Sequence, residues 1–502
     1  MKSVFKAVAI VTIFSVITRA LGFFFRIFLS RKLGAEGIGI YQIAISVLGI
    51  FATLITSGIP LTTAKLVSKY ETNRDIFKRD RAVSSAFIIS VIISLACSLI
   101  IFILTPIWNK IIINAHAVKL LLLLIPSLCF SAIYAVFRGA LWGQNDYFSC
   151  GLTELIEQIV RFVLSIIFLW NITSIVDATK KTVHSFNLTC LISAIIVVII
   201  YLKRCKLNFH KGEYKNIIKS ATPITAVKLT SSLVQPLTTL LIPALLVASG
   251  YTSSEAVSNF GVVMGMTFPM LFVPMAIIGS ISMVLIPSIS SMLSKGDYSS
   301  ISTNIKQSIS VSIFISVLFV PLYLSVGDLI GIVLYDNLSA GVILQASAFC
   351  ILPITLTNLT GSILNALNLE VKSFLNYLLG SIVLIVSLIV LTPILKINAI
   401  TTSYLISMAL ISILNMRKIN KAVPDLKINI ISTTFKYTLI ILPCSILGSL
   451  ISNIFVQSFG NFIAAVLGGG TSIIFVIILS KIFNIYDFKD LFNILKNRKS
   501  KQ

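Results

Sequence analysis

Two arginines lie inside the first long apolar run of the sequence, within ITRALGFFFRIFLSRKLG (residues 17–34). Arg19 stands near the middle of a segment long enough to cross a membrane, and Arg26 follows two helical turns later on nearly the same face. A guanidinium group at membrane depth faces a partner or a water-filled cavity, because hydrocarbon does not solvate it. Its planar fork binds phosphate through two hydrogen bonds. The pair therefore predicts a cavity that selects an anion, although Arg26 is alternatively close enough to the outer interface to extend into it.

A third cation and a proline lie in the seventh apolar run. Lys228 is two turns into this run, where it would either add positive charge to the same cavity or reach back to the cytoplasmic interface. Gln235 and Pro236 follow, and this pair is a candidate helix break that would expose backbone groups to a cavity.

Charged residues of both signs occur around the start of the fifth apolar run. Glu157 and Arg161 are four residues apart, the spacing of a helical ion pair, and Glu154 is placed to meet Arg138. We interpret these four residues as structural ion pairs or as a gate near the inner interface. Arg138 is alternatively placed to contact a phosphate that enters from the cytoplasm.

The elements that must position these residues are membrane helices. Of the 502 residues, 57% are hydrophobic and 11% are charged, whereas ordinary soluble domains have about 25% charged residues. A membrane span needs about 20 apolar residues. The expected fold is therefore all-α and polytopic, with about fourteen spans at 5–29, 37–64, 82–107, 118–141, 153–172, 182–202, 221–248, 257–286, 308–334, 340–366, 373–395, 398–416, 430–453 and 462–484.

The formal net charge of +23 has a membrane explanation. With the N-terminus in the cytoplasm, the inner segments hold 26 Lys and Arg residues and the outer segments hold 6. This bias is the one that fixes membrane orientation, and it predicts a multi-pass plasma-membrane protein with both termini cytoplasmic. The inner surface would also attract anionic membrane lipids. Nucleic-acid binding is not expected, because the basic residues lie in short loops between apolar runs.

Two stretches of the sequence indicate an internal repeat. SGIPLTTAKLVSK (Ser57–Lys69) and MVLIPSISSMLSK (Met283–Lys295) share Ile-Pro, small hydroxyl residues and a final Ser-Lys, at an offset of about 226 residues or six spans. Parallel repeats of this kind form two bundles with a substrate site between them. The expected parts are a six-helix bundle at 1–202, a cytoplasmic linker at 203–220, a second six-helix bundle at 221–416, two additional helices at 430–484 and a basic cytoplasmic tail at 485–502.

Several kinds of chemistry are not indicated. The seven cysteines are scattered without a Cys-x-x-Cys motif, the three histidines are far apart, and no phosphate-binding Gly-x-x-x-x-Gly-Lys-Ser/Thr loop occurs. We therefore expect no metal, no cofactor and no enzyme active site. The apolar interiors of the first and seventh runs also contain no Asp or Glu, which disfavours a cation-coupled multidrug antiporter.

Three stretches and the fourteen-span layout resemble the stage V sporulation protein B group of polysaccharide-export flippases. The stretches are ITRALGFFFRIFLSRKLGAEGIGIYQ, SGIPLTTAKLVSKY and FRGALWGQNDYFSCGLTELIEQIVR. This group belongs to the multidrug/oligosaccharidyl-lipid/polysaccharide exporter superfamily and is similar to the lipid II flippases of peptidoglycan synthesis. The resemblance implies a V-shaped pair of six-helix bundles around a central cavity, with two extra helices. It also implies that Arg19 matches a cavity-lining arginine of the first helix.

The same resemblance implies a function. It is the movement of an undecaprenyl-pyrophosphate-linked cell-wall precursor, similar to lipid II, across the membrane by alternating access. The sporulation group implies a role in spore cortex peptidoglycan and contact with cell-wall synthesis enzymes. Two alternatives stay open at this point: a cation-coupled multidrug or small-molecule antiporter, and a membrane scaffold for cell-wall synthesis.

Overall fold

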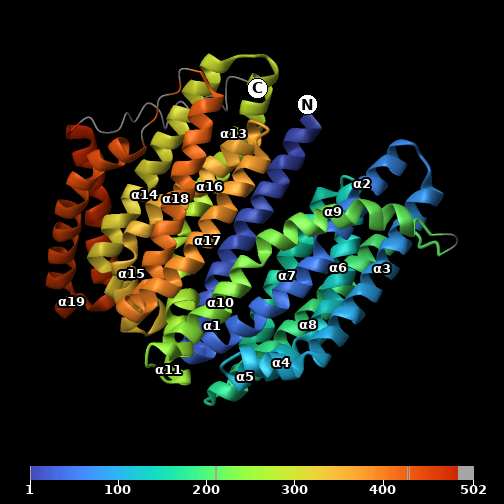
Figure 1. The fold of residues 1–502 in the computed structure, drawn as a ribbon, viewed down its shortest axis with the longest axis horizontal. Helices are drawn as coiled ribbons and strands as arrows, with labels where there is room; N and C mark the ends of the chain where they lie inside the picture. Colours follow the sequence, from blue (N-terminus) through green and yellow to red (C-terminus); the bar gives the residue numbers. More distant parts are fainter. Residues whose placement is uncertain (1, 210–211, 425, 427, 429, 484–502) are drawn as a thin grey trace. The chain divides into compact units, whose positions relative to one another are not determined.

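The computed structural model describes residues 2–209, 212–424, 426, 428 and 430–483 (Figure 1). These residues form helices and connecting turns without a β-strand, which confirms the all-α fold. They divide into two compact units, Met1–Gly261 and Val262–Gln502. The predicted basic tail at 485–502, the last residue of the fourteenth span and residues 210–211 of the predicted linker lie outside the described residues.

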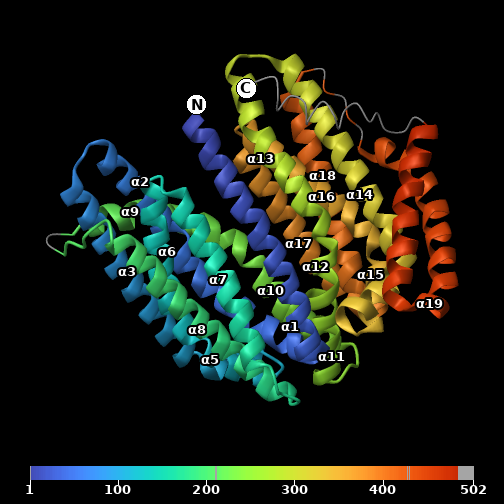
Figure 2. The same ribbon diagram turned by 180° about the vertical axis from the view of Figure 1, so that it is seen from behind.

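Eleven α-helices belong to the first unit. They are α1 (Lys2–Thr56), α2 (Gly58–Thr72), α3 (Ile76–Ile103), α4 (Thr105–Ile111), α5 (Ala115–Leu123), α6 (Ile125–Gly143), α7 (Tyr147–Phe168), α8 (Ile175–Leu202), α9 (Tyr214–Ser232), α10 (Val234–Ala248) and α11 (Ser253–Phe260). Figure 2 shows α7 beside α8 in this unit.

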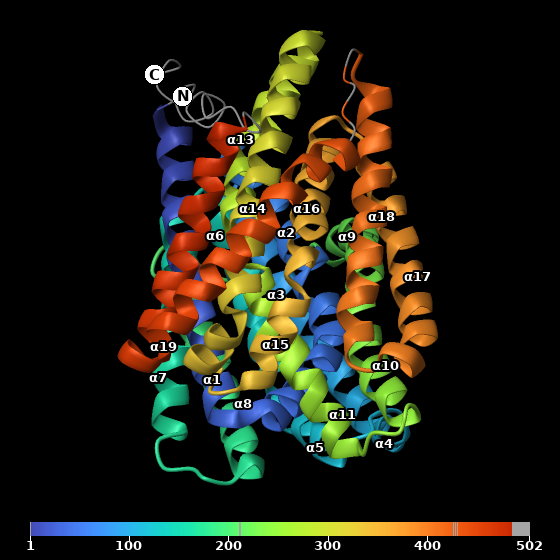
Figure 3. The same cartoon turned by 90° about the vertical axis from the view of Figure 1, so that its left-hand side faces the viewer.

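The second unit begins inside a π-helical turn, η1 (Gly261–Thr267), of which only Gly261 belongs to the first unit. Figure 3 shows α17 and α18 of this unit running side by side. Its described elements are α12 (Phe268–Leu271), α13 (Val273–Ser294), α14 (Tyr298–Tyr335), α15 (Leu338–Ala346), the 3₁₀ turn η2 (Ala348–Cys350), α16 (Ile351–Ala366), α17 (Glu370–Leu395), α18 (Asn398–Ala422) and α19 (Ile430–Ile482).

Eleven helices within the described residues are long and apolar enough to cross a membrane. Two of them change direction at a glycine with positive φ: Gly34 (φ 67°) in α1 and Gly460 (φ 78°) in α19. This backbone conformation favours glycine, and both kinks fall between spans that the sequence predicts as separate. The 22-residue helix α7 is not among the eleven because it carries three charged residues. The multi-pass fold is thus confirmed, and fourteen remains the predicted number of spans.

The helix bounds repeat along the chain at the predicted offset. Adding 226 to the bounds of α6 gives 351–369, and α16 covers Ile351–Ala366. The same operation on α7 gives 373–394, against Glu370–Leu395 for α17. The order and lengths of the helices therefore support an internal repeat. The boundary between the compact units lies further along the chain than the repeat boundary, because α9, α10 and α11 pack on α1 and belong to the first unit.

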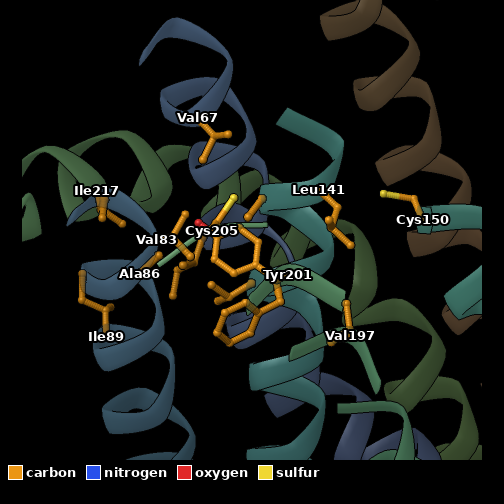
Figure 4. Packing of buried hydrophobic residues seen from close by; sticks show 14 of the residues in the cluster. Val67, Val83, Ala86, Ile89, Leu141, Cys150, Val197, Tyr201, Cys205 and Ile217 are labelled. Atoms are coloured by element: carbon orange, nitrogen blue, oxygen red, sulfur yellow. The ribbon is translucent and has the colours of Figure 1, made fainter. Parts of the chain in front are cut away.

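The first unit has a hydrophobic core where α2, α3, α6, α8 and the start of α9 meet (Figure 4). The Tyr201 side chain lies fully buried at its centre, with its ring 5.3 Å from the ring of Phe137. The core continues into the segment after α8 through Cys205 and reaches α9 at Ile217. Burial of this apolar surface fixes α6 and α9, which carry the candidate site residues Arg138 and Lys228.

In the second unit, α19 packs closely on α14 around small residues. A Cβ atom at Gly468 of α19 would lie 2.9 Å from Val326 Cγ1 of α14 and 2.7 Å from the Gly448 carbonyl oxygen in the other limb of α19, and the hydroxyls of Ser325 in α14 and Ser472 in α19 are 2.9 Å apart. Glycine and serine at such contacts let helix backbones approach, which is how membrane helices associate in the absence of a hydrophobic drive. The two predicted C-terminal helices are the limbs of α19 on either side of Gly460.

Candidate functional site

The rotation of α1 about its axis is set by aromatic contacts with α7. The ring of Phe14 lies 5.6 Å from the ring of Phe148, and the rings of Phe25 and Phe28 lie 6.1 Å and 5.6 Å from the ring of Phe162. Phe14, Phe25 and Phe28 recur at helical spacing, so one face of α1 is held against α7.

A polar face of α1 lies next to this contact face. Thr12, Ser15, Arg19, Gly22 and Arg26 follow one another at steps of three and four residues and therefore share one side of the helix. The Arg19 side chain is exposed and that of Arg26 is half-buried. No atom lies within 4 Å of the position that a Cβ of Gly22 would take, so open space adjoins the helix between the two arginines.

The same helix segment also has an apolar accessible side. Ile13 and Phe24 are 59% and 58% exposed and lie away from Arg19 around the helix, whereas Val16, which is 55% exposed, is three residues before Arg19 and lies beside it. The polar face of α1 therefore borders an apolar accessible surface. The sequence predicted that Arg19 and Arg26 share a face; the structure adds which side of the helix that face occupies and the open space beside Gly22.

Lys228 lies on α9, in the same unit as the two arginines. Helices α9 and α10 run against α1 and α2, where Ala221 and Thr225 pack on Gly58 and the Thr239 hydroxyl donates a hydrogen bond of 3.3 Å to the Ser46 hydroxyl. Lys228 follows Thr225 by one helical turn and is exposed. Within the described residues the structure gives Lys228 no ion-pair partner.

The predicted helix break lies at the junction of α9 and α10. The two helices meet at Leu233, whose backbone keeps right-handed helical angles (φ −68°, ψ −27°). Pro236 lacks the N–H that would bond the Ser232 carbonyl oxygen, which explains an interruption at this position. The Gln235 side chain is exposed and Pro236 is buried.

Arg138 and Glu154 form an ion pair between α6 and α7. The Arg138 Nη2 atom lies 2.5 Å from Glu154 Oε2, and the two side chains are 36% and 40% exposed. The pair joins the end of α6 to the beginning of α7 and stays accessible to a ligand.

Glu157 and Arg161 form the predicted pair within α7, and both side chains are only 19% exposed. The Arg161 guanidinium also lies over the Phe186 ring of α8, 5.3 Å from its centroid. Arg161 and Arg26 both act electrostatically on the buried Tyr41 hydroxyl, so the α7 pair lies near the polar face of α1. Sequence reasoning missed Tyr41, because a tyrosine in an apolar run carries no signal of what it faces.

The electrostatic balance of these residues favours anions. The predicted site residues comprise five cations and two carboxylates, and both carboxylates are already paired with arginines. The described residues contain no cluster of His, Cys, Asp and Glu that would hold a metal ion. Within the described residues Arg19 and Lys228 form no ion pair, so their positive charge is not offset by a carboxylate there.

The comparison with protein families gives one match. The family model described as polysaccharide biosynthesis protein matches residues 4–293, which cover α1 from its third residue, α2 to α12 and all but the last residue of α13.

Two curated relatives and one solved structure are similar to the chain. The stage V sporulation protein B of Bacillus subtilis (strain 168) is 23% identical over 480 residues, which are 92% of each chain. The lipid II flippase MurJ of the same organism is 21% identical over 427 residues, 77% of this chain and 76% of the relative. The structure of a lipid II flippase MurJ in an inward closed conformation has a TM-score of 0.72 at 14% identity and covers 94% of this chain and 99% of that chain.

Proposed function

The chain belongs to the family of polysaccharide biosynthesis proteins, and from this premise we propose that it is a flippase for a lipid-linked saccharide precursor. The precursor is an undecaprenyl-pyrophosphate-linked cell-wall intermediate similar to lipid II. It moves from the inner to the outer leaflet by alternating access, without a covalent intermediate. The relative named stage V sporulation protein B supports a role in sporulation, and within that role we propose a precursor for spore cortex peptidoglycan.

The polar face of α1 carries this proposal. Arg19 and Arg26 flank open space at Gly22, on a helix whose other accessible side is apolar. Two guanidinium groups bind the oxygens of a pyrophosphate through charge-assisted hydrogen bonds. The same two groups would repel a cationic drug. Lys228 adds a third cation to the same unit. The charged head group needs such a path because hydrocarbon excludes it, whereas the prenyl tail can remain in lipid.

The two ion pairs of α7 take different roles in this proposal. Glu157 and Arg161 brace α7 against α8, since their side chains are largely buried and Arg161 stacks on Phe186. Arg138 and Glu154 are more accessible, and a phosphate can exchange with the Glu154 carboxylate on the Arg138 guanidinium. This exchange makes the Arg138–Glu154 pair a gate that opens when an anion arrives.

Reconstitution of the full chain in vesicles tests the function. Fluorescent lipid II is included in both leaflets, and a membrane-impermeant reductant measures how fast inner-leaflet head groups reach the outside. We expect the protein to raise the initial rate at least tenfold over empty vesicles and to leave efflux of a cationic dye unchanged under a proton or sodium gradient. Dye efflux without lipid movement would indicate a multidrug antiporter, and movement of neither compound would indicate a scaffold.

A further inference from the structure

The accessible surface of α16, which lies between Thr357 and Asn365, contains no large apolar residue. Eleven of the 16 residues of this helix are buried. The five that remain accessible are Thr357, Asn358, Gly361, Ser362 and Asn365. Asn358, Gly361, Ser362 and Asn365 recur at steps of three, one and three residues, so they form one stripe, which we call the amide stripe.

Hydrogen bonds on the other sides of α16 fix the direction of the amide stripe. Toward α18, the Thr357 hydroxyl donates to the Met408 carbonyl oxygen at 2.8 Å, and Asn415 Nδ2 donates to the Thr360 hydroxyl at 3.2 Å. Toward α14, the hydroxyls of Thr355 and Ser316 are 2.6 Å apart. The helix therefore cannot turn the amide stripe into the core of its own unit without breaking these bonds.

The amide groups of the stripe are free to bind a ligand. In the part of the chain that the structure describes, the side chains of Asn358 and Asn365 make no hydrogen bond, and Ser362 donates to the Asn358 carbonyl oxygen at 3.0 Å. A Cβ atom at Gly361 would meet only the Ser373 hydroxyl, at 3.7 Å, so the backbone between the two asparagines is open to a close approach.

Lipid does not explain this surface. Asn358 lies near the middle of the apolar segment Ala348–Ala366, where an unpaired amide costs about 4–8 kcal/mol in hydrocarbon. The neighbouring helix α17 shows what a lipid-facing surface looks like, because apart from Pro393 its exposed residues from Leu375 to Ile394 are large and apolar: Leu375, Leu379, Ile382, Val386, Ile389, Val390 and Ile394. The amide stripe therefore faces water or a polar ligand.

The repeat shows that the amide stripe is specific to one half of the chain. At the 226-residue offset, Asn358 corresponds to Ala132, which is buried in α6, and Asn365 corresponds to Gly139, which packs on Pro60. The stripe also contains no charged residue, unlike the polar face of α1. Neutral amide and hydroxyl groups both donate and accept hydrogen bonds, as sugar hydroxyl and acetamido groups do.

We propose that the amide stripe of α16 binds the saccharide of the substrate, and this inference rests on the proposed flippase function. From Asn358 to Asn365 the stripe extends roughly 10 Å at 1.5 Å per residue, which is the length of two linked sugar rings. In this proposal the asparagines of α16 discriminate a glycosylated lipid from a bare one.

Binding of two probes to the full chain in nanodiscs tests this proposal. The probes are undecaprenyl pyrophosphate, which has no sugar, and lipid II, which carries a disaccharide. We expect Asn358→Leu with Asn365→Leu to weaken lipid II binding at least tenfold and to change undecaprenyl pyrophosphate binding less than twofold, because about two neutral hydrogen bonds are lost. Arg19→Gln should weaken the binding of both probes.

The controls distinguish an error in the proposed saccharide site from an error in the proposed flippase function. Asn398→Leu removes an exposed amide elsewhere in the same unit and should leave both affinities unchanged. The Ala versions of the two asparagine changes replace the Leu versions if the latter lower the unfolding temperature. Wild-type lipid II affinity in the double variant, or equal loss of both probes, overturns the saccharide site. Unchanged undecaprenyl pyrophosphate binding in Arg19→Gln overturns the proposed function, whatever the asparagines do.

Discussion

At the scale of single residues, Arg138 and Arg161 differ from Arg19 in what surrounds the guanidinium group. Arg138 and Arg161 each have a carboxylate partner, whereas Arg19 is exposed on a polar face with open space beside it. A paired guanidinium braces helices, and one that faces open space is available to a ligand. The distinction makes opposite predictions for mutants of the two kinds.

Glu157→Gln should destabilise the protein more than it slows transport. The change leaves the Arg161 guanidinium without its partner in a largely buried position, and a buried donor without a partner costs about 1–3 kcal/mol. Thermal unfolding in detergent measures the loss. The double variant Glu157→Gln with Arg161→Gln should regain more than half of it, because no unpaired charge then remains. A variant with normal unfolding and no transport would show that Glu157 acts on the substrate.

At the scale of elements, glycines mark where helices approach and where space remains. Gly22 and Gly261 illustrate the two cases, since a Cβ atom at Gly22 would meet nothing within 4 Å, and one at Gly261 would lie 1.9 Å from the Ala35 carbonyl oxygen. Gly261 also begins the π-helical turn η1, and such turns often occur at functional sites.

Gly22→Leu should keep the fold and block transport. Leucine favours the helix over glycine by up to about 1 kcal/mol, so the unfolding temperature should not fall. Its side chain would fill the open space between Arg19 and Arg26 and exclude the pyrophosphate. Lipid II movement in vesicles, compared with Gly22→Ala as the smaller control, measures the effect. Wild-type rates in Gly22→Leu would place the substrate elsewhere.

Gly261→Ala should have the opposite effect on stability. Its methyl group would overlap the Ala35 carbonyl oxygen, so α11 and η1 would have to move away from α1. We expect the unfolding temperature to drop by several degrees, as overpacking typically costs about 1–3 kcal/mol. An unchanged unfolding temperature would mean that this helix contact is not present in the membrane.

The sequence predicted most of the elements and part of the site. Apolar runs located the helices, and the repeat predicted that α16 and α17 mirror α6 and α7. The first proline of the repeat, Pro60, ends α1 at Thr56 because it cannot donate to the Thr56 carbonyl oxygen, yet the prediction ran the second span through it. The amide stripe was missed, since Asn358 and Asn365 are uncharged and their spacing gains meaning only once the buried faces of α16 are known.

At the scale of the whole molecule, the charge bias of the loops predicts the orientation. Lys110, after α3, should lie outside, and Lys295, after α13, should lie in the cytoplasm; both side chains are exposed. In a variant without the seven native cysteines, Lys110→Cys should react with a membrane-impermeant maleimide in intact cells. Lys295→Cys should react only after the cells are permeabilised. The reverse pattern would contradict the assigned topology.

The account as a whole depends on an unneutralised guanidinium of α1 that binds the pyrophosphate of a lipid carrier. The most direct measurement is the initial rate of lipid II movement in vesicles for Arg19→Gln and Arg19→Lys, with Lys110→Gln as a control that removes a positive charge outside the site. With equal insertion and unfolding temperature, we predict at least a tenfold loss in Arg19→Gln, partial activity in Arg19→Lys and no loss in the control. Lipid II movement at the wild-type rate in Arg19→Gln would contradict the account.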